Sequence, residues 1–281
     1  MTTSRVQIDH VSCYSYSGVV HSSYNELRLT PLSTLWQQLL DLRVEVSPRA
    51  PIFTYIDYWG SQVHAFDIHA PHESLTVVAR SLVESSGQHW EERELGWDAF
   101  VRDDVRDPFA EFLEPTSCVP TDERLHEIGS RLSSSASPLA AAADAIEWVG
   151  ESLTYRSGTT GVHTSAIEAW DGGSGVCQDF AHLSLALLRS MGIPARYCSG
   201  YVYPDGDNRL GERVAGESHA WVEYWVGDWI AMDPTAGCPV DAGHVLVARG
   251  RDYSDVVPLK GIFHGSPTSS MDVEVFLTRL S

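Results

Sequence analysis

The chain has 281 residues, of which 43% are hydrophobic, and carries a formal net charge of −19. This length can bury one large core or two small ones, and the acidic charge excludes the basic surface that nucleic-acid binding requires. The sequence contains no stretch of about 18 apolar residues, which argues against a membrane-spanning helix. Its first ten residues also have no apolar signal segment, so we expect a cytoplasmic location.

Five cysteines and twelve histidines raise the question of disulfides or a metal site. The cysteine number is odd, the spacings are wide and no C-x-x-C pair occurs, so neither a disulfide framework nor a zinc ribbon is expected. The histidines form no H-E-x-x-H motif, and His69 and His72 lie in a turn-like His-Ala-Pro-His run. We therefore expect neither a metal nor another cofactor.

Residues 1–115 show the alternation of apolar and polar positions that is typical of β-strands. Val6, Ile8 and His10 alternate with polar neighbours. Further strand-like runs are found at residues 25–31, 42–46, 55–61, 63–68 and 72–83. Short strands separated by turn residues predict a sheet or sandwich module, and nothing in it indicates catalysis by itself.

Residues 84–120 are acidic and aromatic, and three prolines interrupt them. We predict a linker here, with a short helix near residues 97–103. Thr121, a hydroxyl followed by acidic residues, predicts the start of the next helix. Pro138 can open a second helix, and the alanine-rich run 140–153 has one apolar face. This helix is expected to pack against the helix that follows Cys177.

The stretch 171–191 is the chemical centre of the sequence. Its glycines, which can take backbone angles closed to other residues, lead directly to Cys177; they are Gly172, Gly173 and Gly175. Apolar residues at helical spacing follow, and Gly192 and Pro194 end the pattern. We therefore predict that Cys177 lies in the first turn of a largely buried helix.

A cysteine at a helix N-terminus has a specific chemical meaning. The free N–H groups and the dipole of the first turn stabilise a thiolate, and the same N–H groups can stabilise the oxyanion of an acyl-transfer intermediate. The alternative is that Cys177 is simply a small buried hydrophobic residue, as many free cysteines are.

Strands return after this helix. Residues 195–203 alternate, residues 204–215 form a polar loop that we expect to be mobile and on the surface, and a hairpin follows. His219 begins the first strand of the hairpin and Asp233 ends the second, with a turn at Gly227. For both side chains to share a face, paired residue numbers must add to an even number, which predicts a loop of three or five residues.

Cys177, His219 and Asp233 together form the set that thiol nucleophile chemistry needs. The imidazole takes the thiol proton, or holds the pair as thiolate and imidazolium, and the carboxylate orients the ring. Individually, His219 could be an ordinary strand-end histidine and Asp233 a turn former before Pro234.

Several stretches resemble the transglutaminase-like superfamily of papain-like thiol enzymes. They are Gly-Val-Cys177-Gln-Asp-Phe-Ala-His, Gly-Ile-Pro-Ala-Arg196, Ser218-His219-Ala-Trp-Val-Glu and Trp229-Ile-Ala-Met-Asp233-Pro-Thr. The N-terminal region resembles the β domain that precedes this core in bacterial members. The resemblance implies an α+β fold: a catalytic core at residues 116–281, with the nucleophile helix packed on an antiparallel sheet, preceded by a β-rich module at residues 1–115. It also implies the triad Cys177, His219 and Asp233.

For the remaining polar and aromatic residues near these motifs, the sequence gives weaker indications of a role. We expect Asp179 to have a structural role and His182 to face a neighbouring strand, while the backbone N–H of Cys177 is a better oxyanion donor than Gln178. Three aromatic residues could line the cleft or belong to the core; they are Tyr155, Trp170 and Trp221.

The function that we predict is acyl transfer from a peptide or protein amide. Attack by Cys177 releases an amine, and the acyl group then passes to water or to another amine. We place water first, which predicts a peptidase or amidase. Crosslinking or peptide-bond formation is the second hypothesis, and a non-catalytic peptide-binding scaffold is the third.

Overall fold

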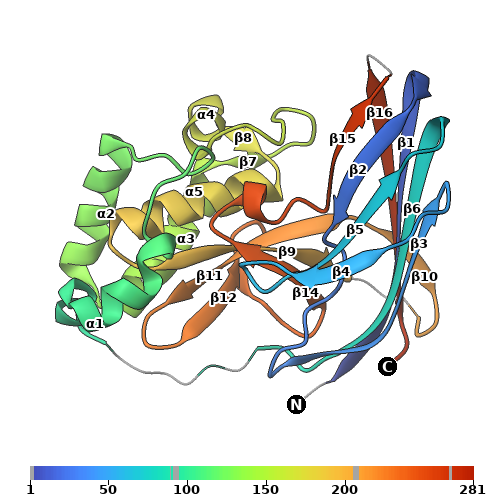
Figure 1. Ribbon diagram of the computed structural model, residues 1–281. Helices are drawn as coiled ribbons and strands as arrows, with labels where there is room; N and C mark the ends of the chain where they lie inside the picture. The colour runs from blue at the N-terminus through green and yellow to red at the C-terminus, as the bar shows by residue number, and fades with distance from the viewer. Residues whose placement is uncertain (1–2, 89, 91–94, 205–208, 266–267) are drawn as a thin grey trace.

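Strands dominate both ends of the chain and helices its middle (Figure 1). The computed structural model describes residues 3–88, 90, 95–204, 209–265 and 268–281. Its fold is α+β, as predicted. The strands are β1 (Ser4–Val20), β2 (Ser22–Leu27), β3 (Gln37–Ser47), β4 (Phe53–Ile56), β5 (Gln62–Ile68), β6 (His72–Ser85), β7 (Thr154–Tyr155), β8 (Ser174–Gly175), β9 (Ala195–Val202), β10 (Arg213–Gly216), β11 (Ser218–Trp225), β12 (Trp229–Asp233), β13 (Cys238–Pro239), β14 (His244–Gly250), β15 (Leu259–His264) and β16 (Ser269–Arg279).

The helices connect the two strand-rich parts. They are η1 (Trp97–Val101), α1 (Asp103–Arg106), η2 (Asp107–Phe112), α2 (Glu123–Ser135), α3 (Pro138–Ser152), α4 (Ala166–Gly172), α5 (Cys177–Ser190) and η3 (Tyr253–Asp255). Pro138 opens α3 as predicted. The start of α2 is one residue later than predicted, because the carboxylate of Asp122, and not Thr121, accepts the N–H groups of Arg124 and Leu125. None of these described helices is long and apolar enough to cross a bilayer.

The predicted β-rich N-terminal region is confirmed, and strands from the other end of the chain complete its sheets. One sheet has the order β10-β16-β1-β6-β3 and the other the order β15-β2-β5-β4. The prediction of a polar loop at residues 204–215 is wrong for its last residues, because they belong to β10, which pairs with β16. These two strands are too far apart in the sequence for local patterns to predict their pairing. Residues 205–208 of that loop lie outside the described residues. The division at residue 115 stays a prediction.

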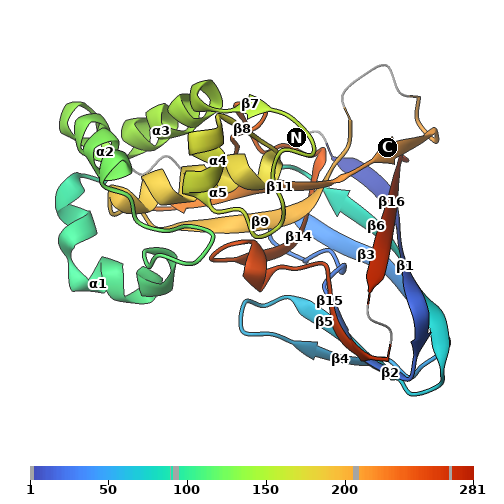
Figure 2. The same cartoon turned by 90° about the horizontal axis from the view of Figure 1, so that it is seen from above.

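The central sheet carries the candidate site and has the order β13-β12-β11-β9-β14. Figure 2 shows α5 lying over β9 and β11, and α2, α3 and α4 pack against α5. Successive side chains of β11 face opposite sides. Ala220 and Val222 share the apolar core of α5, whereas Trp221 lies in a separate cluster with Cys198 and Leu246.

A segment of the N-terminal region covers the face of the central sheet that α5 leaves free, where Leu32 packs against the cluster of Trp221, and it also bonds to the edge strand β14. The side-chain amide of Gln37 donates to the carbonyls of Leu32 and Leu246, at 2.6 and 2.8 Å. The amide of Leu246 donates back to the side-chain oxygen of Gln37 at 2.8 Å. The N-terminal region is thus part of the packing around the sheet that carries the site.

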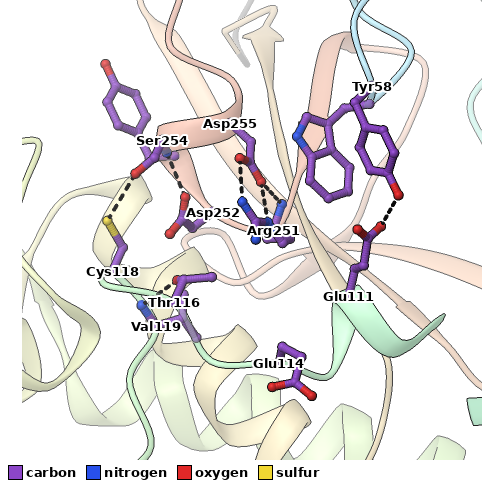
Figure 3. Close-up of polar contacts among 12 residues, drawn as sticks. Tyr58, Glu111, Glu114, Thr116, Cys118, Val119, Arg251, Asp252, Ser254 and Asp255 are labelled. Atoms are coloured by element: carbon purple, nitrogen blue, oxygen red, sulfur yellow. Dashed lines mark hydrogen bonds and ion pairs between the residues drawn. The ribbon is translucent and has the colours of Figure 1, made fainter. Parts of the chain in front are cut away.

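The segment between the two strand-rich parts is anchored at several points (Figure 3). The predicted short helix near residues 97–103 is present as η1, which α1 and η2 follow. The Tyr58 hydroxyl donates to the Glu111 carboxylate at 2.8 Å, and the Cys118 sulfur lies 3.8 Å from the Ser254 hydroxyl. This linker therefore contacts both the β-rich region and the turn at η3.

The close strand packing around Gly200 gives a test of the central sheet. A Cβ at this position would overlap the carbonyl oxygen of Val245 and lie 2.7 Å from the ring of Trp221. We expect Gly200→Ala to lower the free energy of unfolding by about 1–3 kcal/mol, measured by urea denaturation. Gly172→Ala is the control, because a Cβ there meets nothing within 4 Å. Equal urea midpoints for the two variants would contradict the packing described here.

Candidate active site

The loop before α5 places Cys177 where the sequence predicts it. Helix α4 begins with a capping box between Ser165 and Glu168 and is capped at its C-terminus by Gly173, whose φ is 64°. Strand β8 then pairs with β7, and α5 starts at Cys177 itself. Of the three predicted loop glycines only Gly173 has a positive φ. Gly175 meets a steric requirement instead, because a Cβ there would lie 2.6 Å from the side chain of Asp179.

Asp179 holds the first turn of α5 in place. Its carboxylate accepts the backbone N–H of Val176 at 2.7 Å and the hydroxyl of Thr160 at 2.6 Å. Burial raises the pKa of Asp179, and these two hydrogen bonds oppose the shift. The side chain of Asp179 therefore links Thr160 to Val176, the residue before Cys177. This agrees with the structural role predicted for it.

The register of the β11–β12 hairpin places His219 and Asp233 on the same face. Trp225 pairs with Trp229, and Val222 pairs with Met232, so paired residue numbers add to an even number and residues 226–228 form a three-residue loop. The predicted loop length is confirmed. It places Asp233 on the face of the hairpin that carries His219.

His219 and Asp233 form a direct hydrogen bond between Nε2 and Oδ2, at 2.7 Å. The Asp233 side chain is only 3% exposed and that of His219 is 14% exposed. The other carboxylate oxygen of Asp233 accepts the backbone N–H groups of Thr235 and Ala236, at 2.8 and 3.2 Å. The backbone of the following turn thus fixes the orientation of the carboxylate.

The electrostatics of the pair favour a protonated imidazole. Burial lowers the pKa of His219, but its hydrogen bond to Asp233 and its interaction with Cys177 outweigh burial and raise it to about 9. Burial alone would raise the pKa of Asp233, yet its bonds to His219 and His244 hold it well below the usual range. Since Nε2 of His219 is bonded to Asp233, Nδ1 is the nitrogen left for Cys177. The hydrogen bond joins His219 to Asp233, and Cys177 is among the groups that raise the pKa of His219; the action of the three as a triad stays a prediction.

His244, which the sequence does not single out, lies on the far side of Asp233. Its Nε2 is 3.6 Å from the Asp233 Oδ2, and its Nδ1 is 3.0 Å from a carboxylate oxygen of Asp241. The Asp241-x-x-His244 spacing is visible in the sequence, but the pairing of β14 with β9 that brings His244 to the site is not.

His219, Asp233 and His244 also offer one ligand atom each within 4.8 Å of one another. Two imidazole nitrogens and a carboxylate oxygen are donors that zinc accepts. One of these contacts, however, is already the short hydrogen bond between His219 and Asp233. The absence of a metal therefore stays a prediction, which chelation can test.

The other candidate residues differ in their positions. His182 is buried, its ring centroid is 5.1 Å from that of Tyr197 on β9, and it accepts the backbone N–H of Tyr253, so it faces a strand as predicted. Trp221 is 1% exposed and belongs to the core. Tyr155 is 49% exposed and lies on β7 beside the approach to Cys177.

Two large cavities lie elsewhere in the molecule. Their volumes are about 550 and 610 Å³, and both are lined by residues of the linker and of α2. Cys177, His219 and Asp233 line neither. The geometry of the three side chains, and not cavity size, identifies the candidate site.

Family models match the two parts of the chain separately. The model of the transglutaminase-like superfamily matches residues 127–234, and that of the bacterial transglutaminase-like N-terminal region matches residues 6–84. The chain belongs to the transglutaminase-like superfamily. Both matches agree with the resemblance predicted from the sequence.

Relatives of this transglutaminase-like protein extend over its whole length. An uncharacterised protein of Mycobacterium leprae is 43% identical and the alignment covers 99% of both chains. A crystal structure of a candidate cysteine protease from Cytophaga hutchinsonii has a TM-score of 0.80 and 22% identity, covering 100% of this chain and 92% of that one. A protein-glutamine gamma-glutamyltransferase of Pseudomonas aeruginosa is 39% identical over 24% of this chain and 10% of its own length.

The site geometry makes a prediction about thiol reactivity. We expect iodoacetamide to alkylate Cys177 faster than the other four cysteines near neutral pH, because the helix start and His219 stabilise its thiolate. His219→Ala should slow this reaction by roughly tenfold, as measured by mass spectrometry of partially labelled protein. Equal labelling of all accessible cysteines in both proteins would contradict the assignment.

The raised pKa of His219 makes a second prediction, about stability. The folded protein binds this proton more tightly than the unfolded chain, whose histidine has an ordinary pKa of 6.5. The stabilisation is therefore complete below pH 6.5 and is lost as the pH rises through about 9. Urea denaturation should show the wild type losing stability over this range relative to His219→Gln. Parallel curves for the two proteins would show that the pair does not hold this proton.

Proposed function

We propose that this transglutaminase-like protein is a cysteine-dependent enzyme that transfers an acyl group from a peptide or protein amide. Cys177 is the nucleophile, His219 the acid and base, and Asp233 the group that orients His219. The observation that carries the proposal is the 2.7 Å hydrogen bond between His219 and Asp233; Cys177 is also among the groups that raise the pKa of His219.

The chemistry follows from these positions. The Cys177 thiolate attacks the amide carbonyl carbon, and the backbone N–H of Cys177 at the start of α5 stabilises the oxyanion. The intermediate collapses as the C–N bond breaks, and the His219 imidazolium gives its proton to the departing amine. The product is a thioester on Cys177, with His219 now neutral.

The second half of the reaction decides the class of enzyme. His219 takes a proton from the acceptor, which attacks the thioester carbon, and the proton returns to the Cys177 sulfur as it leaves. Water as acceptor yields a carboxylic acid, and a primary amine yields a new amide. We place water first, because amine transfer requires a site that excludes water and neither large cavity reaches Cys177.

Amine transfer is the second candidate, and a specific observation favours it. The Pseudomonas aeruginosa relative is described as a protein-glutamine gamma-glutamyltransferase, a name that denotes transfer of an acyl group from glutamine. The fold neighbour from Cytophaga hutchinsonii is described as a candidate cysteine protease. A peptide-binding scaffold without catalysis stays the third candidate.

An acceptor competition separates these candidates. A glutamine peptide and a short peptide library are each incubated with the enzyme, with and without a labelled primary amine, and mass spectrometry identifies the products. We expect cleaved or deamidated peptides with little amine adduct. These products should vanish in Cys177→Ala and fall by roughly a hundredfold or more in Asp233→Asn, because the ring loses its orienting carboxylate.

The controls of this experiment give each hypothesis its own outcome. Cys13→Ala removes another partly exposed cysteine and should leave the products unchanged. A dominant adduct at millimolar amine would replace the hydrolase with the transferase. Gel ladders are a poor readout, because Lys260 is the only lysine of the chain. No turnover together with an unreactive Cys177 would support the scaffold.

A further inference from the structure

The carboxylate of Asp233 lies between two imidazole rings. Its Oδ2 is 2.7 Å from the Nε2 of His219 and 3.6 Å from the Nε2 of His244, and the ring centroids of the two histidines are 6.3 Å apart. The contact with His219 is short enough for a hydrogen bond, whereas the contact with His244 is too long for one and is within ion-pair distance. The mechanism proposed above assigns no task to His244.

The side chain of His244 is held in place and screened from solvent. It is 6% exposed, and its ring centroid lies 5.5 Å from that of Trp221 in an edge-on arrangement. Its Nδ1 is 3.0 Å from the Asp241 Oδ1, and that same oxygen accepts the backbone N–H of Gly243 at 2.8 Å. The contact with Asp241 therefore fixes the orientation of the ring, with its Nε2 directed at Asp233.

The protonation state of His244 follows from its two neighbours. A neutral ring that donates from Nδ1 to Asp241 would aim the lone pair of Nε2 at the carboxylate of Asp233. The backbone N–H of Asp241 also lies 3.3 Å from Nδ1, but a neutral ring that donates from Nε2 to Asp233 would set the Nδ1 lone pair 3.0 Å from the Asp241 carboxylate oxygen. Only the imidazolium presents N–H groups to both carboxylates. Burial lowers the pKa of His244, but the interactions with Asp233 and Asp241 outweigh burial and raise it, in agreement with the geometry.

Other charged groups near this ring are already paired. Glu223, which lines the same small cavity as His244, is bonded to Arg249 at 2.8 Å and to Arg196 at 2.6 Å. The groups that face His244 are therefore Asp233 from β12, Asp241 from the turn before β14, and His219 from β11.

We propose that His244 is a positioning residue: as an imidazolium it holds the Asp233 carboxylate from the side opposite His219. The four side chains then form a chain of alternating charge, from Asp241 through His244 and Asp233 to His219. This inference rests on the proposed function, because it concerns the same Asp233 and His219. Its consequence is electrostatic as well as steric: the charge of His244 limits how strongly Asp233 favours the protonated form of His219.

The test is an NMR titration of His219 in the full-length protein. His244→Gln places an uncharged amide nitrogen near the position of Nε2, so it keeps a donor for Asp233 and removes the positive charge. The pKa of His219 should then rise by roughly two units, the effect expected for the loss of a unit charge about 6 Å away. A purely structural role predicts the opposite sign, because a loosened Asp233 would let the pKa of His219 fall.

Two further variants complete the experiment. His244→Asn places its amide nearer the position of Nδ1 and leaves Asp233 without a donor, so kcat for peptide hydrolysis should fall about tenfold with KM unchanged and recover in His244→Gln. His126→Gln, at an exposed site on α2, should change neither quantity. Near-UV circular dichroism confirms that each variant is folded.

The titration decides the inference even if no substrate is hydrolysed, so its failure is distinguishable from a failure of the proposed function. An unchanged or lowered pKa of His219 in His244→Gln would overturn the inference. So would micromolar binding of Zn²⁺ to the wild type that is lost in both His244→Gln and His219→Gln, because these side chains would then be metal ligands.

Discussion

The carboxylate of Glu223 is a charge that three strands of the central sheet share. It is 3% exposed and accepts hydrogen bonds from Arg196 on β9 and Arg249 on β14. A buried charge without its partners costs several kcal/mol, so the order β11-β9-β14 is the arrangement in which Glu223 is satisfied. The same order brings His219 and His244 to Asp233. The candidate site thus depends on an ion pair that takes no part in its chemistry.

The central sheet is enclosed from both sides, and each side contributes to the site. Helix α5 packs on one face and supplies Cys177 at its start. The segment around Gln37 covers the other face, where Leu32 packs against the cluster of Trp221, and it bonds to the edge strand β14 at Leu246, two residues after His244. In this transglutaminase-like protein the N-terminal region therefore supports the strand that carries His244, which gives that region a structural purpose beside any role in substrate binding.

Local patterns predicted the parts of the site that depend on neighbouring residues. The position of Cys177 follows from a glycine loop and a helical repeat, and the face shared by His219 and Asp233 follows from alternation within one hairpin. The contribution of His244 could not be predicted this way, because pairing between β9 and β14 joins segments that alternation does not relate. The same reason explains why the sequence predicts a loop where β10 lies: its partner β16 is more than fifty residues further along the chain.

Strand β1 has its neighbours at opposite ends of the chain. It pairs with β6 on one side and with β16 on the other, and the amide of Leu280 donates to the carbonyl of Arg5 at 2.7 Å. During synthesis β1 can pair with β6 early, while its other edge stays unpaired until residues 269–279 have been made. At ordinary ribosome speeds that delay is on the order of ten to forty seconds. An unpaired edge can pair with other chains, so the newly made protein is exposed to aggregation throughout the interval before residues 269–279 emerge.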